Sequence, residues 1–265
     1  MTPILTTNHL KFHYPDQPPL FTNLDLSIAS GEVMTILGPN GIGKSTLLQC
    51  VMGLLRPTGG AVDILGKSLL AIPTKQRAQL VAYVPQHSNL HVGLTVLDFV
   101  VTGRTPYLAF SQPPKPTDYA LAEQALNRLG IASLASQTIN TLSGGQLQLA
   151  TIAKALVQEP KLIVLDEPTS ALDFGRQQEV LTLILKLAAD GIAVMMTTHD
   201  PNHAFILNQT VGLFDHSGHL TTGSPADLLT EANLRRTYHT ALKLLYVPEL
   251  QRNVCELQMR GASVK

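Results

Sequence analysis

The sequence is poor in cysteine, has no excess of either charge and contains no long apolar run, and each absence argues against a class of protein. Cys50 and Cys255 are its only cysteines, so we expect no disulfide framework and a reducing, cytoplasmic environment. Cys50 falls within an expected helix and is interpreted as core packing. No segment has the roughly eighteen consecutive apolar residues that span a bilayer. The first residues also lack the pattern of a signal peptide, so we expect neither a membrane span nor a signal peptide.

The charge balance argues against a nucleic-acid partner. Lysine and arginine together number 19, as do aspartate and glutamate, and they form no dense basic cluster. Proteins that bind many phosphates of DNA or RNA usually have a basic face. Internal repeats and low-complexity segments are also lacking, and the proline-rich stretch 111–116 is interpreted as a loop. A chain of 265 residues, 45% of them hydrophobic, is long enough for a substantial core and one appended subdomain.

What is present begins with a glycine-rich loop between an expected strand and an expected helix. The apolar run 33–37 predicts a short buried strand, and apolar residues at helical spacing over 47–55 predict a helix. Between them, GPNGIGKST at 38–46 matches the phosphate-binding pattern G-x-x-x-x-G-K-[ST]. Because the pattern stands between a strand and a helix, it predicts a nucleotide site rather than an ordinary glycine-rich turn.

Each residue type in this loop suits a polyphosphate. Gly41 and Gly43 let the backbone turn its N–H groups toward the ligand. Lys44 is expected to contact the terminal phosphates, and the Ser45 hydroxyl is expected to ligate Mg²⁺. The candidate binding residues are Gly38, Pro39, Asn40, Gly41, Gly43, Lys44, Ser45 and Thr46.

Two carboxylates follow a second expected strand, over 162–165. Asp166 and Glu167 come at its end, and parallel α/β sheets place their ligands at the carboxyl ends of strands. Asp166 is the natural partner of Mg²⁺, whereas Glu167 is positioned to polarise an attacking water. Taken alone, the two acids could equally be the start of a solvated loop. The phosphate loop elsewhere in the chain favours the catalytic interpretation.

A third expected strand, in GIAVMMTTHD, ends at His199. A histidine at that sheet edge either contacts the γ-phosphate or its water, or is an ordinary polar residue satisfied within the fold. The other histidines form no convincing ligand cluster. His216 and His219 are interpreted as part of a turn between two short strands.

A second anion-binding pattern occurs in TLSGGQLQLA, residues 141–150. Ser143 precedes two glycines that open a run with helical periodicity. Unpaired N–H groups and the helix dipole both favour an anion at such a helix start.

Together these motifs resemble the ATP-binding cassette (ABC) family. The phosphate loop, LSGGQ at 142–146, LIVLDE at 162–167, SALD at 170–173 and TTH ending at His199 occur in the order and spacing of that family. The resemblance implies an α/β P-loop NTPase (RecA-like) core with a mostly parallel sheet, an N-terminal antiparallel β subdomain and a helical subdomain over about 87–141. It assigns residues 1–240 to the ATPase domain and leaves 241–265 as a C-terminal extension without an assigned role.

The resemblance also implies roles that the residues alone do not establish. Gln86 is expected to sense Mg²⁺ and water at the catalytic site, where Lys44, Glu167 and His199 also act. Tyr14 is expected to stack on adenine, or else to pack as an aromatic at a strand end. Two chains are expected to form a homodimer in which one chain's signature residues, Ser143, Gly144, Gly145 and Gln146, contact ATP held by the other, with Asp173 facing the partner.

The sequence between residues 87 and 142 indicates the class of ABC ATPase more narrowly. VTGRTPY and QALNRLGI resemble importer ATPases for iron–siderophore, haem or cobalamin chelates. A molybdate or tungstate importer and a non-transport ABC ATPase remain alternatives. An importer implies two permease subunits, an indirect substrate-binding protein and a place at the cytoplasmic face of the inner membrane. Arg104 either helps to dock the permease or is a solvated charge at a helix end.

The sequence departs from the family after LSGGQ. Relatives carry a basic residue, glutamine and arginine there, whereas this chain has Leu147, Gln148 and Leu149. Leu149 and Leu156 belong to the expected inward face, and Leu147 is expected to be exposed. We hypothesise that this region meets its partner less electrostatically than in relatives. Near the end of the chain, 226–240 predicts one or two helices and 245–259 predicts strands or a dimer contact.

Overall fold

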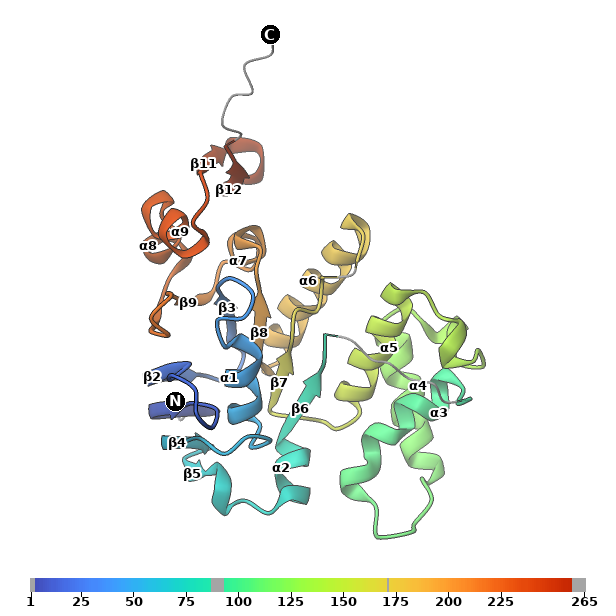
Figure 1. Ribbon diagram of the computed structural model, residues 1–265. Helices are drawn as coiled ribbons and strands as arrows, with labels where there is room; N and C mark the ends of the chain where they lie inside the picture. Colours follow the sequence, from blue (N-terminus) through green and yellow to red (C-terminus); the bar gives the residue numbers. More distant parts are fainter. Residues whose placement is uncertain (1–2, 87–92, 171, 259–265) are drawn as a thin grey trace.

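The computed structural model describes residues 3–86, 93–170 and 172–258. Its central element is a sheet in the order β10-β9-β3-β8-β7-β6 (Figure 1). Its strands are β3 (Val33–Leu37), β6 (Val81–Val84), β7 (Leu162–Leu165), β8 (Ala193–Thr198), β9 (Thr210–Phe214) and β10 (Leu220–Gly223). Neighbouring strands are parallel except β9 and β10. The three strands expected from the motifs are confirmed, and the mostly parallel sheet confirms the expected fold class.

A second, antiparallel sheet lies toward the N-terminus, in the order β2-β1-β4-β5. It comprises β1 (Leu5–Phe12), β2 (Phe21–Ile28), β4 (Gly59–Ile64) and β5 (Lys67–Ser68). Buried and exposed residues alternate along much of β2, as expected of a strand with one face on the core. One apolar cluster joins this sheet to α1 (Lys44–Val51) and to β3, β7 and β8. Cys50 is fully buried within it, which confirms its expected role in packing.

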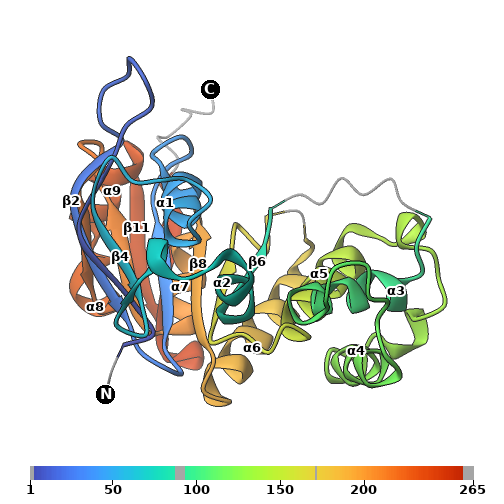
Figure 2. The same cartoon turned by 90° about the horizontal axis from the view of Figure 1, so that it is seen from below.

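The helices that follow form most of the other half of the molecule. They are α2 (Thr74–Leu80), α3 (Val96–Val101), α4 (Pro116–Arg128), α5 (Gly144–Leu156) and α6 (Phe174–Ala189), with 3₁₀ turns at Leu69–Ala71, Thr102–Tyr107, Ala132–Leu134 and Ile139–Thr141. Figure 2 shows α3, α4 and α5 gathered at one end, with the two larger sheets at the other and α6 between. Within the described residues, no helix has the length and apolar character needed to cross a membrane. The expected helical subdomain begins within residues 87–92, which lie outside the described residues, so its boundaries stay a prediction. Ala171 of SALD also lies outside the described residues.

The packing of α5 confirms one expectation and corrects another. Leu149, Ile152 and Leu156 are buried, as the helical spacing predicted. Leu147, expected to be exposed, is half-buried and packs against the same core. The expectation was wrong because α3, α4 and β6 all contact α5, so its buried face is wider than one stripe.

Arg104 corrects both interpretations of its role. Its guanidinium is buried, pairs with Asp118 at 3.0 Å and Glu159 at 2.7 Å, and donates to the carbonyl oxygen of Val157 at 2.7 Å. The Tyr107 ring lies 3.9 Å from its central carbon. Arg104 is therefore neither a solvated charge nor a docking residue, because tertiary packing brings α4 and the end of α5 around it.

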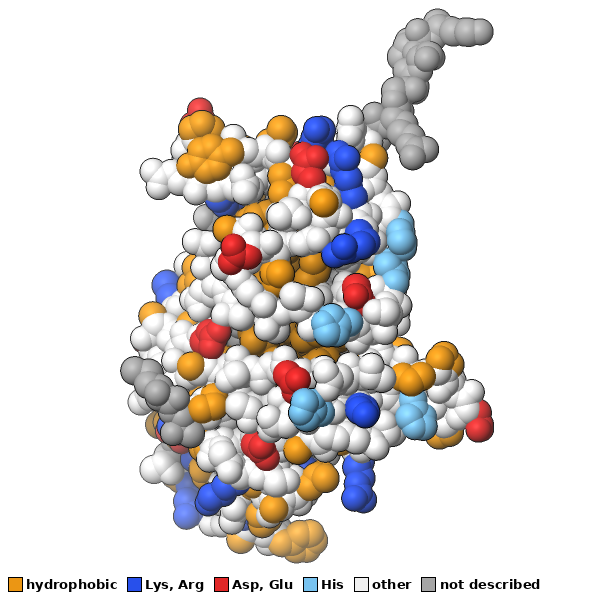
Figure 3. Space-filling model, turned by 90° about the vertical axis from the view of Figure 1, so that its left-hand side faces the viewer, with side chains coloured by type: hydrophobic (Ala, Val, Ile, Leu, Met, Phe, Trp, Pro, Cys, Tyr) orange, Lys and Arg blue, Asp and Glu red, His pale blue; other side chains and the backbone are white. Residues whose placement is uncertain are grey.

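The chain ends in a small layer over the central sheet, drawn in orange to red in Figure 1. It comprises α7 (Pro201–Leu207), α8 (Pro225–Leu228), α9 (Glu231–Tyr238), β11 (Leu242–Val247), a 3₁₀ turn (Pro248–Leu250) and β12 (Arg252–Leu257). The helices and strands expected here are confirmed, and β11 and β12 pair only with each other among the described strands. On the face shown in Figure 3, basic, acidic and histidine side chains are interspersed, without a single-sign patch.

Candidate nucleotide site

Four neighbouring strands of the central sheet bring the candidate catalytic residues together. The phosphate loop follows β3, His199 follows β8, Asp166 and Glu167 follow β7, and Gln86 lies two residues beyond β6. In the sheet these strands run β3-β8-β7-β6 and are parallel, so their carboxyl ends form one edge. Residues separated by more than a hundred positions therefore meet at the place where open α/β sheets bind ligands.

The phosphate loop is folded around its own lysine. Lys44 Nζ donates to the carbonyl oxygens of Gly38 at 2.8 Å and Pro39 at 3.1 Å, and the side chain is only 5% exposed. Gly41 has φ +81° with open space where a Cβ would lie, and Gly43 has φ +110°. Both conformations favour glycine, and they leave the backbone open to a close ligand.

A cleft of about 450 Å³ opens in front of this loop, a volume suited to a small-molecule ligand. It is lined by Tyr14, Gln17, Leu20, Asn40, Gly41, Gly43, Lys44, Ser45, Thr46, Gln86 and Glu167. Tyr14 stands at its side, 37% exposed, with its hydroxyl 3.3 Å from that of Thr46. Its ring also meets Phe12 edge to face at 5.0 Å, so Tyr14 both packs at a strand end and presents a ring to the cleft.

Glu167 is the point where the strand ends converge. Its Oε1 lies 3.4 Å from Lys44 Nζ, and its Oε2 accepts from Gln86 Nε2 at 3.3 Å and lies 3.0 Å from His199 Nδ1. The carboxylate is 10% exposed, so it is largely shielded from solvent. A carboxylate in contact with a lysine, an amide and an imidazole is fixed in position and can accept a proton from a water held against it.

The backbone at Glu167 is strained, with φ +45°. Its amide nitrogen donates to Thr197 Oγ1 at 3.0 Å, and that hydroxyl donates to Asp166 Oδ1 at 2.7 Å. The fully buried Thr197 thus holds both acidic residues from the neighbouring strand β8. Such conformations persist only where the surroundings over-determine them. Sequence reasoning gave Thr197 no role, although it stands within the TTH motif.

The oxygen donors beside the phosphate loop fit Mg²⁺. Ser45 Oγ lies 3.2 Å from Asp166 Oδ1, and Tyr83 donates to Asp166 Oδ2 at 3.5 Å. Burial, reinforced by the Asp166 charge, raises the pKa of Tyr83 to about 12, so its hydroxyl remains a donor. A hydroxyl and a carboxylate are hard donors of the kind Mg²⁺ prefers, completed in such sites by phosphate and water. Among the described residues, histidine, cysteine and acidic side chains form no group of three that suggests another metal site.

The signature residues lie outside this cleft. Ser143 caps α5, and its side chain and that of Gln146 bond each other's backbone amides at 3.3 and 2.9 Å. Asp173 caps α6 by accepting from the Arg176 amide at 2.9 Å. Gly144 and Gly145 form the first turn of α5. None of these residues lines the phosphate cleft of its own chain.

A buried histidine behind His199 was missed by sequence reasoning. His203 on α7 is 6% exposed, and its Nδ1 lies 2.9 Å from Thr198 Oγ1 and 3.5 Å from Thr169 Oγ1. Burial lowers the pKa of His203, which favours the neutral ring, and its Nδ1 makes the contacts with both hydroxyls. One imidazole therefore connects the loop after β7 with the end of β8. In the sequence, His203 stands four positions after His199, and no pattern singles it out.

The fold and the phosphate loop define the chain as a P-loop nucleoside triphosphatase. The chain belongs to the ABC transporter family, whose model matches residues 21–170, and it is an ATPase that binds ATP. The resemblance inferred from its motifs is confirmed.

Two relatives and one solved structure illustrate the similarity. The chain is 37% identical to a molybdate import ATP-binding protein of Haemophilus influenzae, over 90% of this chain and 89% of that one. It is 33% identical to the iron(3+)-hydroxamate import ATP-binding protein of Bacillus subtilis, over 95% and 93%. A metal-chelate type ABC transporter in an inward-facing conformation matches with a TM-score of 0.86 and 32% identity, over 97% and 98%.

Proposed function

We propose that this chain is the ATP-hydrolysing subunit of an ABC importer. The observation that carries the proposal is the convergence of Lys44, Gln86 and His199 on the Glu167 carboxylate from adjacent strand ends. In hydrolysis, water attacks the γ-phosphorus and the bond from that phosphorus to the β–γ bridging oxygen breaks. ADP leaves with the electron pair of the broken bond on this oxygen. The proton of the attacking water is taken up by Glu167.

The other residues act on binding and position. Lys44 supplies the positive charge for the terminal phosphates. The backbone N–H groups that the loop conformation at Gly41 and Gly43 leaves available face the phosphate chain. His199 holds the carboxylate and the attacking water in place, and Gln86 contacts the same oxygen of Glu167 at 3.3 Å. Tyr14 presents its ring to the adenine side of the cleft.

Ser45 and Asp166, with Gln86 nearby, are the residues that would hold Mg²⁺. Bound there, the ion would neutralise charge on the phosphate oxygens. Asp166 is held ready by the Thr197 and Tyr83 hydroxyls, and Ser45 is the first-turn hydroxyl of α1.

The site is completed by a second copy of the chain. Ser143, Gly144, Gly145 and Gln146 form the start of α5, outside the cleft of their own chain, and the first two are exposed. An anion is stabilised at such a helix start. In a head-to-tail homodimer this helix start contacts the γ-phosphate bound by the partner, and Asp173 faces the partner beside it. Hydrolysis then removes the group that links the two chains.

The relatives support two candidate classes of cargo. Similarity to the metal-chelate type transporter and the hydroxamate-import subunit favours an iron–siderophore, haem or cobalamin-type chelate. The molybdate-import relative, at 37% identity, supports an oxyanion importer as the second candidate. Either system adds two permease subunits and an external substrate-binding protein, with this chain bound at the cytoplasmic face of the membrane. The ligand of the substrate-binding protein separates the two candidates.

Glu167→Gln tests the catalytic assignment. The amide cannot take up the proton, so we expect kcat to fall by roughly a hundredfold or more while ATP still binds. Lys44→Ala should instead weaken nucleotide binding itself. Turnover by phosphate release and affinity by fluorescent-nucleotide titration separate these effects. Glu123→Gln on the exposed side of α4 is the matched control and should retain parental activity. Parental turnover in Glu167→Gln would remove Glu167 from this role.

A further inference from the structure

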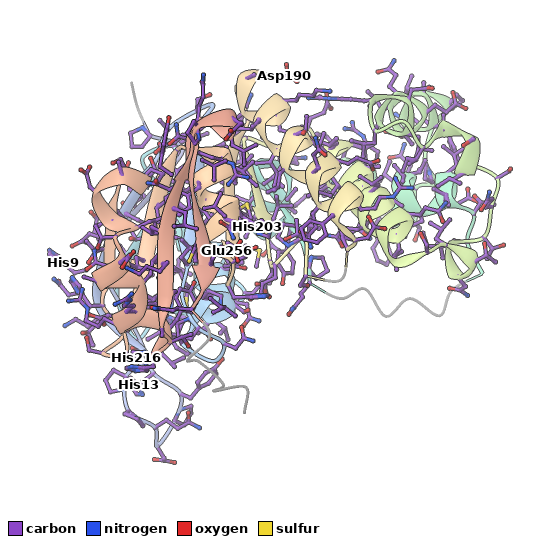
Figure 4. The ribbon with its side chains drawn as sticks, turned by 90° about the horizontal axis from the view of Figure 1, so that it is seen from above. His9, His13, Asp190, His203, His216 and Glu256 are labelled. Atoms are coloured by element: carbon purple, nitrogen blue, oxygen red, sulfur yellow. The ribbon has the colours of Figure 1, made fainter. Side chains whose placement is uncertain are left out.

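The C-terminal hairpin β11–β12, which sequence reasoning left without a role, packs against the helix that follows His199. Helix α7 begins at Pro201, two residues beyond His199, and contacts β12. An apolar cluster beneath them includes Leu37 of β3, Phe205 of α7 and Leu242 of β11, with Cys255 against it. Figure 4 labels His203 on α7 and Glu256 on β12, and these two elements contact each other. The hairpin therefore covers α7 on the side that carries Asn202.

One side chain makes the polar connection between these elements. The Asn202 carboxamide donates through Nδ2 to the carbonyl oxygen of Cys255 at 3.2 Å and accepts from the Cys255 amide at 2.8 Å through Oδ1. Cys255 is paired with Leu244 in the hairpin, yet both its backbone groups bind Asn202. They therefore lie on the edge of β12 that faces away from β11. Asn202 acts as a short strand partner for that edge.

From Asn202 the contacts continue to the reacting end of the sheet. Nδ1 of the next residue, His203, lies within hydrogen-bonding distance of the hydroxyl oxygens of Thr198 and Thr169, at 2.9 and 3.5 Å. Thr198 also accepts from the Asp200 amide at 3.1 Å. The residues immediately before and after His199, Thr198 and Asp200, are therefore both held by hydrogen bonds. The segment on which His199 stands is thus joined to the hairpin on one side and to the loop after β7 on the other.

His199 depends on such support because little else holds it. Its side chain is 52% exposed, and its one hydrogen bond in the described structure is to Glu167. Helix α7 has seven residues, too few to be stable without tertiary contacts. Displacements well below 1 Å reduce the rate of reactions that depend on positioned groups.

We propose that the C-terminal hairpin positions His199 through Asn202, so that Asn202 is a positioning residue for ATP hydrolysis. The proposal rests on the role of His199 and Glu167 proposed above. It gives the extension beyond about residue 240 a function within its own chain: loss of the Asn202–Cys255 pair lets α7 move away from the sheet edge. The phosphate loop follows β3 and has contacts of its own, from Lys44 to the carbonyl oxygens of Gly38 and Pro39.

The experiment uses two full-length variants that break the same pair from opposite sides. Asn202→Leu removes both side-chain hydrogen bonds. Cys255→Pro removes the backbone donor on the outer edge of β12, where proline leaves the ladder to β11 intact. Cys255→Ala keeps the backbone and is the control for the second variant. Asn253→Leu, the same substitution two residues away on β12, is the control for the first. Each protein is measured for kcat and KM with ATP, for fluorescent-nucleotide affinity and for thermal unfolding.

We expect Asn202→Leu and Cys255→Pro to lower kcat about fivefold, the effect of one or two lost hydrogen bonds, with KM and nucleotide affinity within about twofold of the parent. Both controls should retain the parental kcat. A parental kcat in the two variants overturns the proposal. So does a loss of kcat accompanied by an equal loss of nucleotide affinity, because a general structural defect would lower both. If Asn202→Leu does not fold, Cys255→Pro decides alone.

His199→Ala separates this proposal from the one on which it rests. If the parent does not hydrolyse ATP, or if His199→Ala keeps the parental kcat, the catalytic assignment fails and the positioning role fails with it. If His199→Ala is inactive and Asn202→Leu is fully active, only the positioning role is overturned.

Discussion

Thr197 shows how much of the site depends on a residue that touches no substrate. Its hydroxyl accepts the Glu167 amide and donates to Asp166, so it fixes the strained turn between the two acids. Strand β8 places Thr197 at full burial, where water cannot replace either bond. The proposed general base, Glu167, and the proposed metal-binding carboxylate, Asp166, therefore share one anchor on the neighbouring strand.

Thr197→Val tests that anchor. Valine has the same shape but leaves the buried Glu167 amide without an acceptor, which costs about 1–3 kcal/mol of stability. We expect kcat to fall more than ATP affinity, since the phosphate loop is unaffected. Urea unfolding and steady-state hydrolysis measure the two effects. Thr35→Val, at a buried threonine on the adjacent β3, is the control. Equal losses in both variants would contradict the anchor role.

Some residues of the site could be predicted from local sequence patterns. Others are placed by tertiary packing and could not be predicted in this way. The phosphate loop and the acids after β7 follow from short motifs beside apolar runs, because strand ends and glycine turns are local features. Thr197 and Asn202 could not be found this way. Their partners, Glu167 and Cys255, are 30 and 53 positions away, and no local pattern signals such pairs.

At the scale of elements, Arg104 holds together the helices beside the sheet. It joins the turn after α3 to Asp118 of α4 and to the backbone at the end of α5. The hydrogen bond from the Lys115 amide, together with Arg104, lowers the pKa of Asp118. A lowered pKa in the folded state means that this stabilisation is fully present above the unfolded value near 3.8 and is lost as the pH falls through the lowered one.

Arg104→Met should destabilise the chain by about 3 kcal/mol, because it leaves the Asp118 carboxylate buried without its cation. Acid unfolding should also begin at a higher pH than in the parent, since part of the lowering of the Asp118 pKa is removed. Chemical and acid denaturation measure both changes. Arg104→Met combined with Asp118→Leu removes the unpaired charge and should recover most of the loss. No recovery would mean that the ion pair is not the source of the effect.

Arg104 also shows why a feature that depends on several elements was wrongly predicted from the sequence. Arg104 follows a helical run and precedes a proline, which is typical of a solvated helix end. It is buried because α4 and α5, far along the chain, close around it, and its charge is satisfied by partners 14 and 55 positions away. The inward face of α5 was predictable from its periodicity, whereas the width of that face was not.

At the scale of the whole molecule, the proposed site combines the cleft of one chain with the start of α5 of a second copy. In the proposed homodimer, the residues after LSGGQ approach the partner without the basic side chains of relatives. Leu147→Arg adds such a charge on a half-buried surface from which a long side chain can extend. We expect ATP-dependent dimerisation of the Glu167→Gln protein to depend weakly on salt, and to depend more strongly once Leu147→Arg is added. Light scattering over a salt series measures this, and identical salt dependence would refute it.

The contact between Lys44 and Glu167 links the two ends of the proposed reaction. The ammonium group and the carboxylate lie 3.4 Å apart, so each neutralises the charge of the other. Under the proposed mechanism, a bound γ-phosphate competes with Glu167 for the Lys44 ammonium group, while Gln86 and His199 continue to hold the carboxylate. Binding of the phosphate and adjustment of the proposed base are then one event.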